Sequence, residues 1–369
     1  MREILYLSHD SLLEGVGASQ VLSYMRKVQQ FIPVTIISFE KVLPNELQIN
    51  EVQREGLKWM PLPFGSFGIM GGIGRVVRMW LRVERSKIIH ARSTLPALAA
   101  MLRFPRSWIW DCRSLQADQR RALSESNVLT AQFLIMRGIE YLLAKKASAI
   151  IVITHAVVPI FIGRFNIKES KIRIITTCVD IEKFRDVPFK RTKEIKILLA
   201  GTFSAAYDLD LINKIIERLK ELRRVKITIA TSLGSTDLWK KINYDLVTSV
   251  LHNEMPNLIQ EHDIGVSIWK NDLGISLASV ASTKTAEFLA CGRPIIINSL
   301  QGDFGTIVGN EKSGVVTQGS SPSEIHDYAN KILELIDDER TVSRCRNLAV
   351  REFNLDMAVV KLIHMYQEI

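Results

Sequence analysis

Residues 282–297 read Ser-Thr-Lys-Thr-Ala-Glu-Phe-Leu-Ala-Cys-Gly-Arg-Pro-Ile-Ile-Ile, a stretch that joins a helix to a buried strand. Ser282 is a favourable residue for the start of a helix, and Gly292 stands where the helix would end in a left-handed residue. Pro294 then opens an apolar run that is typical of a strand. The stretch therefore predicts one helix-to-strand step of an α/β fold.

The same alternation of short apolar strands and longer helical patterns extends over the whole chain. In the first half we expect strands at 3–8, 34–38, 87–91, 108–112, 149–153 and 172–175. The helices expected there are 19–30, 74–85, 94–102 and 129–146. In the second half we expect strands at 195–200, 226–230, 264–268 and 294–298 and helices at 209–222, 283–290, 322–336, 340–351 and 357–367. Strands and helices in alternation predict βαβ units, and hence parallel sheets with helices on both faces.

The chain is predicted to form two domains, because 369 residues exceed what one hydrophobic core usually supports. The alternation pauses over residues 176–194, which are polar and which we interpret as a linker. We therefore expect α/β architecture with two Rossmann-like, doubly wound domains at 1–185 and 186–350. Residues 351–369 are expected to form a C-terminal helix that packs back on the first domain.

The composition excludes several classes of protein. Hydrophobic residues make up 47% and charged residues 24%, as in an ordinary globular protein, which argues against disorder or collagen. No apolar run approaches the roughly 20 residues of a membrane-spanning helix, and the first residues lack the apolar core of a signal peptide. Four widely spaced cysteines fit a reducing cytoplasm and predict neither a zinc site nor disulfides.

Positive charge is concentrated in the first half of the chain. Residues 1–185 hold 26 Lys and Arg against 15 Asp and Glu, a net charge of +11, whereas the remaining residues hold 22 against 24, a net charge of −2. A basic half next to a nearly neutral half indicates an anionic partner for the first domain. Nucleic acid, an anionic membrane surface and a phosphorylated substrate all fit this charge.

The start of the helix at 283–290 has the features of a diphosphate site. A helix N-terminus presents unpaired N–H groups and the positive end of a dipole, and Lys284 adds a full charge. Glu287 lies on the same face and would accept hydrogen bonds from a ribose diol. The alternative is an amphipathic helix with a solvent-exposed Lys–Glu pair.

This stretch resembles the nucleotide-binding signature of GT-B glycosyltransferases, in particular family 4: Lys-x-x-Glu, two hydrophobic residues, Ala-x-Gly-x-Pro-Val. Its fixed positions are matched here by Lys284, Glu287, Ala290, Gly292 and Pro294. The resemblance implies two domains facing across a cleft, with a nucleotide-sugar donor in the second and a hydroxyl acceptor in the first. In that family the Glu holds the donor ribose. The donor-binding residues so implied are Gly201, Thr202, Ser282, Thr283, Lys284 and Glu287.

Other segments extend the resemblance over nearly the whole chain. The Gly15-Val16-Gly17 turn resembles the family's first glycine-rich loop, which contacts sugar or phosphate, although such turns often serve packing alone. Residues 89–93 and 110–114 resemble segments of capsule and exopolysaccharide glycosyltransferases. Residues 177–184 resemble the family's Gly-Val-Asp-x-x-x-Phe stretch, with Cys178 in place of Gly.

Two departures from the family pattern concern charge. The second Glu expected eight positions before Glu287 is Ser279, and the Arg and Lys expected after Gly201 are absent. Those two cations normally neutralise the diphosphate leaving group. Either another cation takes this role, such as Lys284, Lys270 or an arginine of the first domain, or the chain is a catalytically silent partner subunit.

Polar residues at strand ends in the first half are the candidates for chemistry. Asp111 and Arg113 end a predicted strand, where ligands of open α/β sheets gather. Asp111 would orient or deprotonate an acceptor hydroxyl and Arg113 would meet a phosphate, the alternative being a structural salt bridge. His9 and Arg92 are further acceptor or phosphate candidates. The histidines lack metal-ligand spacing, so we expect no bound metal and no cofactor beyond the donor.

A basic helix pattern in the first half predicts a membrane contact. Arg75, Arg78, Arg82 and Arg85 recur every three or four residues beside apolar side chains, a pattern that would rest on an anionic membrane or form a solvated helix face. Residues 61–68 before it read as a flexible loop. We expect a cytoplasmic protein with peripheral contact at the inner face of the plasma membrane.

The leading interpretation is a glycosyltransferase that moves a sugar from a nucleotide sugar to a lipid-linked saccharide in cell-surface polysaccharide synthesis. The resemblance implies a metal-independent, retaining reaction. A nucleotide-sugar epimerase of the same fold is an alternative, as is the silent partner subunit. A dehydrogenase fits poorly, because the glycine loop lacks a third glycine and only Glu40 stands near the place of a ribose-binding acid. Nucleic-acid binding is disfavoured because the basic residues are not interleaved with an aromatic platform.

Overall fold

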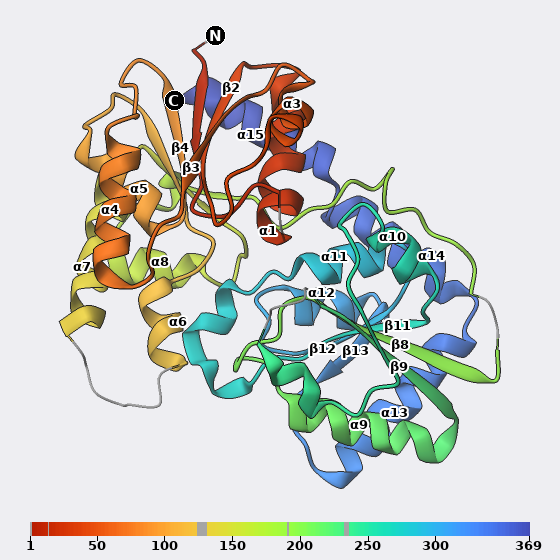
Figure 1. Cartoon of the computed structure of the whole chain (residues 1–369). Coiled ribbons are helices and arrows are strands. Elements are labelled where there is room, and N and C mark those ends of the chain that lie inside the picture. Colours follow the sequence, from red (N-terminus) through yellow and green to blue (C-terminus); the bar gives the residue numbers. More distant parts are fainter. Residues whose placement is uncertain (1, 14, 124–130, 190–191, 232–235) are drawn as a thin grey trace. The chain divides into compact units, whose positions relative to one another are not determined.

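The computed structural model describes residues 2–13, 15–123, 131–189, 192–231 and 236–369. It divides into two compact units (Figure 1). Unit 1 comprises Met1–Thr176 and Asp356–Ile369, and unit 2 comprises Thr177–Leu355. The first two residues of the helix expected at 129–146 lie outside the described residues.

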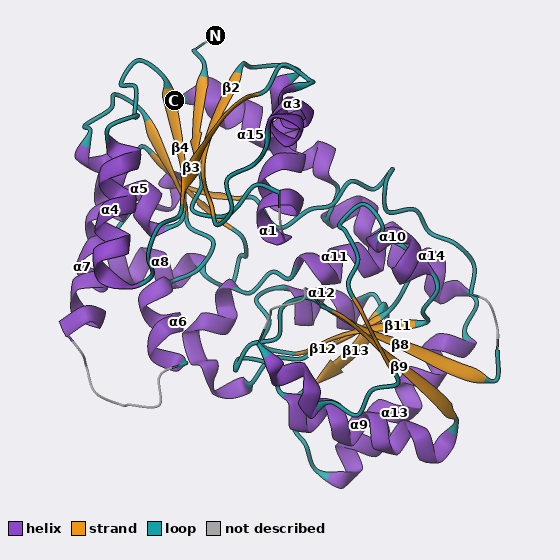
Figure 2. Ribbon diagram, viewed as in Figure 1, coloured by secondary structure: helices purple, strands orange, loops and turns teal. Residues whose placement is uncertain are grey.

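Unit 1 is built on a seven-stranded parallel sheet with the strand order β3-β2-β1-β4-β5-β6-β7. Helices cover both faces of this sheet (Figure 2). Its strands are β1 (Ile4–Leu7), β2 (Val34–Glu40), β3 (Lys58–Pro63), β4 (Ile88–Arg92), β5 (Trp108–Asp111), β6 (Ala149–Val152) and β7 (Ile172–Ile174). Its α-helices are α1 (Gly15–Gly17), α2 (Ser23–Gln29), α3 (Glu46–Gln53), α4 (Gly68–Trp80), α5 (Thr94–Leu102), α6 (Gln116–Ala122), α7 (Ala131–Lys146), α8 (Val158–Phe165) and α15 (Leu355–Glu368).

Unit 2 is built on a six-stranded parallel sheet with the strand order β10-β9-β8-β11-β12-β13. The strands are β8 (Glu194–Ala200), β9 (Arg224–Ala230), β10 (Leu246–Thr248), β11 (Ile264–Ser267), β12 (Ile295–Asn298) and β13 (Gly314–Thr317). The α-helices are α9 (Leu209–Leu222), α10 (Met255–Gln260), α11 (Thr283–Ala290), α12 (Phe304–Asn310), α13 (Pro322–Asp337) and α14 (Arg340–Glu352). The two doubly wound α/β domains expected from the alternating pattern are therefore confirmed.

The segment interpreted as a linker is packed into unit 2 over its first part. The Val179 amide donates to the Phe353 carbonyl over 2.9 Å, and the Leu355 amide donates to the Val179 carbonyl over 3.0 Å. Cys178 and Phe184 are buried beside it. These bonds tie the segment to the end of α14, so unit 1 ends at Thr176 rather than at residue 185. The C-terminal segment that belongs to unit 1 begins at Asp356 rather than at residue 351.

The expectation of a flexible loop at residues 61–68 is wrong for its first part. Residues 58–63 form β3, whose register with β2 runs from Thr35 opposite Lys58 to Glu40 opposite Pro63. The helix that follows begins at Gly68 rather than at residue 74. Gly71 allows this early start, because a side chain there would collide with the backbone of Ser66.

Candidate functional site

The donor-binding residues predicted in unit 2 gather at the start of α11. Ser282 stands just before the helix with an extended backbone, and Ser282, Thr283 and Lys284 are partly exposed, whereas the helix is buried from Thr285 onward. The body of α11 is pressed onto strand β11, because the Phe288 ring lies directly over Gly265. The sheet therefore fixes the position of the helix N-terminus.

Lys284 and Glu287 form an ion pair one turn into α11. The Lys284 Nζ lies 2.8 Å from Glu287 Oε2, and the Glu287 side chain is fully buried. The other oxygen, Oε1, makes no hydrogen bond within the described chain and faces His252 Nδ1 at 3.7 Å. Burial lowers the pKa of His252, and the ring packs against Phe184. A buried carboxylate with an unused acceptor oxygen beside an ammonium group suits a ligand that offers hydroxyls and negative charge.

Gly201 follows β8 and lies beside Lys284. Its backbone φ is 125°, and a Cβ built there would stand 4.0 Å from both Lys284 Cε and the Tyr207 hydroxyl. The exposed Thr202 comes next in the chain. Two lysines were considered as replacements for the missing Arg and Lys. Lys284 stands next to this turn, and the side chain of Lys270 is exposed to solvent.

An aromatic pair follows the turn at Gly201. Tyr207 stacks on Trp269 with ring centroids 5.2 Å apart, and burial raises the pKa of Tyr207 to about 12, so the phenol stays neutral. Ser279 is buried, and its hydroxyl donates to the Ser276 carbonyl within a 3₁₀ segment, Asn271–Ser279. Neither Tyr207 nor Ser279 carries a charge.

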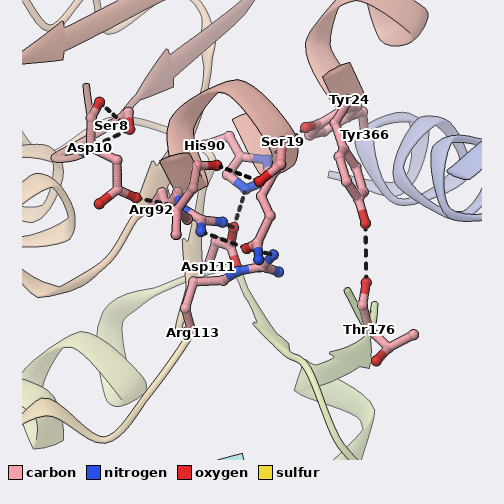
Figure 3. Close-up of polar contacts among 12 residues, drawn as sticks. Ser8, Asp10, Ser19, Tyr24, His90, Arg92, Asp111, Arg113, Thr176 and Tyr366 are labelled. Carbon is pink, nitrogen blue, oxygen red and sulfur yellow. Dashed lines mark hydrogen bonds and ion pairs between the residues drawn. The ribbon is translucent and has the colours of Figure 1, made fainter. Parts of the chain in front are cut away.

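The candidates of unit 1 converge at the carboxyl ends of three neighbouring strands. Asp10 follows β1, Arg92 ends β4 and Asp111 ends β5, with Arg92 directly opposite Asp111 in the sheet. Arg113 lies two residues beyond. Figure 3 shows Arg92 and Arg113 on either side of Asp111. The strand order β1-β4-β5 thus gathers residues that lie far apart in the sequence.

The two arginines share partners. Arg92 Nε donates to Asp10 Oδ2 over 2.9 Å, and both guanidinium groups donate to the side-chain oxygen of Gln20, over 2.8 Å from Arg92 and 2.7 Å from Arg113. Each also faces Asp111 at 3.6 Å. Arg92 NH1 and Arg113 Nε make no hydrogen bond within the described chain. The pair therefore retains donor capacity for an anionic or hydroxylated ligand.

Asp111 is held ionised. Burial by itself would raise the pKa of this carboxyl, but Arg113, His90 and Arg92 together hold it well below its usual range. Such a carboxylate is a weak proton acceptor at neutral pH. Its neighbour His90 is fully buried, and this burial lowers the pKa of the imidazole. The His90 Nδ1 lies 2.6 Å from the hydroxyl of Tyr366, on α15.

The glycine loop is fixed by packing. Gly15 has a left-handed backbone with open space around it, whereas a side chain at Gly17 would collide with the Ser11 carbonyl. The Glu40 carboxylate accepts from the Leu12 amide over 3.0 Å and from the hydroxyls of Ser11 and Ser38. Glu40 is therefore occupied in holding this loop, and it does not offer a ribose-binding carboxylate.

His9 packs among aromatic rings. Its ring lies edge-on to Phe64 at 5.5 Å and to Phe39 at 6.4 Å, and burial lowers its pKa. At neutral pH His9 is therefore a neutral polar group rather than a cation for phosphate.

The expected basic face of the helix at 74–85 is wrong in its first half. Arg75 is buried, stacks on the Phe64 ring and donates to the Phe64 and Ser66 carbonyls. Arg78 donates to the Pro63 and Phe64 carbonyls. The exposed side chains within α4 and directly beside it are apolar, and the exposed Arg82 and Arg85 follow the helix. The apolar ones are Phe67, Ile69, Met70, Ile73, Val77 and Leu81.

In the described part of the chain, no three or more His, Cys, Asp or Glu side chains gather where they could hold a metal ion. Among the helices that the structure describes, none is long and apolar enough to cross a membrane.

Sequence reasoning missed four of the residues that complete these sites. Gln20, His90 and Tyr366 join the unit 1 cluster, and His252 joins Glu287. His90 lies within the segment 89–93 that carries the family resemblance, and this was the one feature of the sequence that could have indicated a role for it. The others come from helices and loops whose packing no local pattern encodes.

Comparison with known proteins shows what this chain resembles. Residues 25–183 match the sequence model of Glycosyltransferase Family 4. A curated relative, the UDP-Gal:alpha-D-GlcNAc-diphosphoundecaprenol alpha-1,3-galactosyltransferase of Escherichia coli, is 23% identical over 260 residues. The match spans 63% of this chain and 63% of that enzyme.

Solved structures agree over the full length. Sucrose-phosphate synthase from Thermosynechococcus elongatus matches with a TM-score of 0.72 and 13% identity, covering 100% of this chain and 99% of that one. Anabaena HepE in complex with UDP matches with a TM-score of 0.70 and 12% identity, covering both chains completely. The chain thus has the GT-B fold of these solved structures and is similar to the family 4 glycosyltransferases over residues 25–183.

Proposed function

We propose that this protein is a glycosyltransferase that moves a hexose from a nucleotide-sugar donor to a hydroxyl of a lipid-linked saccharide. The observation that carries the proposal is the buried Glu287 carboxylate, with one oxygen paired to Lys284 and the other unused, at the start of α11 beside Gly201. The likeness to a galactosyltransferase and to UDP-bound HepE supports it. The reaction is proposed to be metal-independent and retaining and to serve surface polysaccharide synthesis.

Unit 2 is proposed to hold the donor. Glu287 Oε1 would accept hydrogen bonds from the ribose, and Lys284, Ser282, Thr283 and the first amides of α11 would face the diphosphate. Charge develops on the leaving diphosphate in the transition state, so a fixed ammonium and helix dipole stabilise it there more than in the ground state. Gly201 and Thr202 would border the diphosphate opposite Lys284.

Unit 1 is proposed to hold the acceptor. The relative from Escherichia coli acts on a diphosphate-linked saccharide. Arg92 and Arg113, with their unused N–H groups, suit such a phosphate. Because its pKa is held low, we assign Asp111 the orientation of the arginines rather than deprotonation of the acceptor hydroxyl. Gly15, Gly17 and His9 would line the same end of the sheet.

Helix α4 is proposed to bring unit 1 to the membrane that carries a lipid-linked acceptor. Its exposed apolar side chains suit insertion among acyl chains. No acidic residue occurs from 56 to 83, which favours an anionic surface.

Ile69→Glu is expected to reduce sedimentation with vesicles that contain anionic phospholipid. Leu47→Glu, at an equally exposed site on α3, is the control and should leave it unchanged. Equal binding of both variants would refute this contact.

The donor site is tested by thermal shift with UDP, GDP and CMP and their sugar conjugates. Stabilisation by one nucleotide class is expected, with loss of the response in Glu287→Gln. Lys331→Ala serves as the matched control, because Lys331 forms a surface ion pair with Asp327 on α13. The transfer assay then pairs the responding donor with GlcNAc-diphosphoundecaprenol. A folded protein without any nucleotide response would refute the proposal.

A second candidate is a catalytically silent subunit that binds a nucleotide sugar. The observation that favours it is the Tyr207–Trp269 stack after Gly201, where the family pattern has two cations. This candidate predicts nucleotide binding that depends on Glu287 but no sugar transfer and no release of nucleoside diphosphate. Turnover in the transfer assay would exclude it.

A further inference from the structure

We propose that Tyr366, on the C-terminal helix, is a positioning residue: through His90 it fixes the Asp111 carboxylate that aligns Arg92 and Arg113. This inference rests on the proposed function at one point: the proposed function supplies the ligand of the two arginines. The contacts involved all lie within unit 1.

The first contact joins the helix α15 to the sheet. The Tyr366 hydroxyl lies 2.6 Å from His90 Nδ1, and both side chains are buried. The Tyr6 ring also packs against the imidazole, with ring centroids 4.4 Å apart. The buried imidazole therefore contacts two aromatic residues and has little freedom to rotate.

The second contact acts together with the first on the tautomer of His90. Its Nε2 faces Asp111 Oδ2 at 3.4 Å and makes no hydrogen bond within the described chain. An ionised carboxylate only accepts hydrogen bonds, so the imidazole proton belongs on Nε2. Nδ1 is then the unprotonated nitrogen, and it accepts from the Tyr366 hydroxyl, which keeps its proton because burial raises its pKa. Asp111 and Tyr366 thus favour the same tautomer, and loss of the tyrosine hydroxyl would leave only the 3.4 Å contact with Asp111 to hold it.

The third contact passes from Asp111 to the arginines. Oδ2 faces Arg92 and Oδ1 faces Arg113, each at 3.6 Å. These distances exceed those of close charge-assisted hydrogen bonds, so the carboxylate orients the guanidinium groups without using up their donors. If the His90 ring turned, Asp111 Oδ2 would lose its contact with Nε2 and keep only Arg92. The carboxylate that faces both arginines would then no longer be held in place.

The test is Tyr366→Phe, with Tyr24→Phe as the matched control. Tyr24 is a buried tyrosine of the same unit, and its hydroxyl donates to the Thr176 carbonyl over 3.2 Å, away from His90. Figure 3 shows both tyrosines. In protein labelled with ¹⁵N-histidine and ¹⁵N-arginine, wild type and Tyr24→Phe should show a single His90 tautomer with a protonated Nε2. Tyr366→Phe should show a tautomer mixture and shifted Nε–H resonances of Arg92 and Arg113.

The kinetics of sugar transfer provide a second measurement. With the acceptor as the varied substrate, Tyr366→Phe is expected to raise KM about tenfold, the size of one lost buried hydrogen bond, with a smaller effect on kcat. The double variant Tyr366→Phe/His90→Gln should be no worse than His90→Gln alone, because both act along one path.

The outcomes separate the two proposals. An unchanged His90 tautomer and unchanged arginine resonances in Tyr366→Phe would overturn the positioning role, whatever the activity. A tautomer shift in a protein that transfers no sugar would retain the positioning role and remove the proposed function. If Tyr366→Phe does not fold, His90→Gln takes its place, and unshifted arginine resonances in that variant would overturn the proposal.

Discussion

Gly265→Ala is expected to disturb helix α11 from its buried side. Gly265 lies in β11 at the centre of the unit 2 sheet, and its backbone touches the Phe288 ring of α11. An added Cβ would lie 2.7 Å from two ring carbons, whereas ordinary contacts begin at about 3.4 Å. The ring must therefore withdraw by about 0.7 Å, and it is buried on every side.

The cost follows from overpacking. Forcing one methyl group into a filled core typically costs about 1–3 kcal/mol. In a unit of this size each kcal/mol lowers the melting temperature by about 2–4 °C, so a decrease of roughly 3–10 °C is expected. Glu287 precedes Phe288 in the helix, and the stabilisation by nucleotide should therefore also weaken.

The assay is thermal unfolding with and without the responding nucleotide. Gly163→Ala in α8 is the control, because a Cβ there meets nothing within 4 Å, and it should leave stability unchanged or raise it by about 0.5–1 kcal/mol. A melting temperature of Gly265→Ala equal to that of wild type would refute the close packing of α11 on β11.

Two further predictions concern unit 1 and unit 2 separately. Burial raises the pKa of Glu140 from 4.5 to about 7, so between these values the folded state binds more protons and stability falls as the pH rises. Glu140→Gln is expected to remove this fall, and its free energy of unfolding at pH 8, measured by urea titration, should exceed that of the wild type by about 2–3 kcal/mol. Parallel pH profiles of the two proteins would contradict this prediction. In unit 2, Ser321 and Glu324 form a capping box at the start of α13. Ser321→Ala should lower the free energy of unfolding by about 1 kcal/mol, as measured by chemical denaturation, while Ser320→Ala should leave it unchanged. Equal effects of the two substitutions would show that the cap is unimportant.

The sequence predicted the central strands of both sheets and one edge strand, β7, and missed the other three edge strands. Strands inside a parallel sheet are buried on both faces and read as continuous apolar runs, such as the isoleucines of β12. The strands that were missed, β3, β10 and β13, are all edge strands. β3 carries Pro61 and Pro63, which indicate a loop in the sequence but are tolerated where one side of the strand has no partner.

The candidate site was predictable where it depends on strand ends. Asp111 and Arg92 could be named because each ends a recognisable strand, and parallel strands end at one edge. Their contacts could not be predicted, because Gln20 and Tyr366 reach them from helices far away in the sequence. The role of Arg75 was misjudged for the same reason: helical spacing places it on a face but does not show that the preceding loop covers that face.

The unit 1 cluster is better explained by binding than by stability. Burying a charge is costly, and a buried ion pair rarely does better than the apolar residues that could replace it. Here Arg92 and Asp111 are almost completely buried, yet they face each other at 3.6 Å rather than at close hydrogen-bond distance, and Arg92 NH1 has no hydrogen bond in the described chain. A cluster that served stability alone would have closed these contacts. The proposed binding of an anionic ligand to these guanidinium donors, at the carboxyl end of the parallel sheet, would offset the cost of burying them.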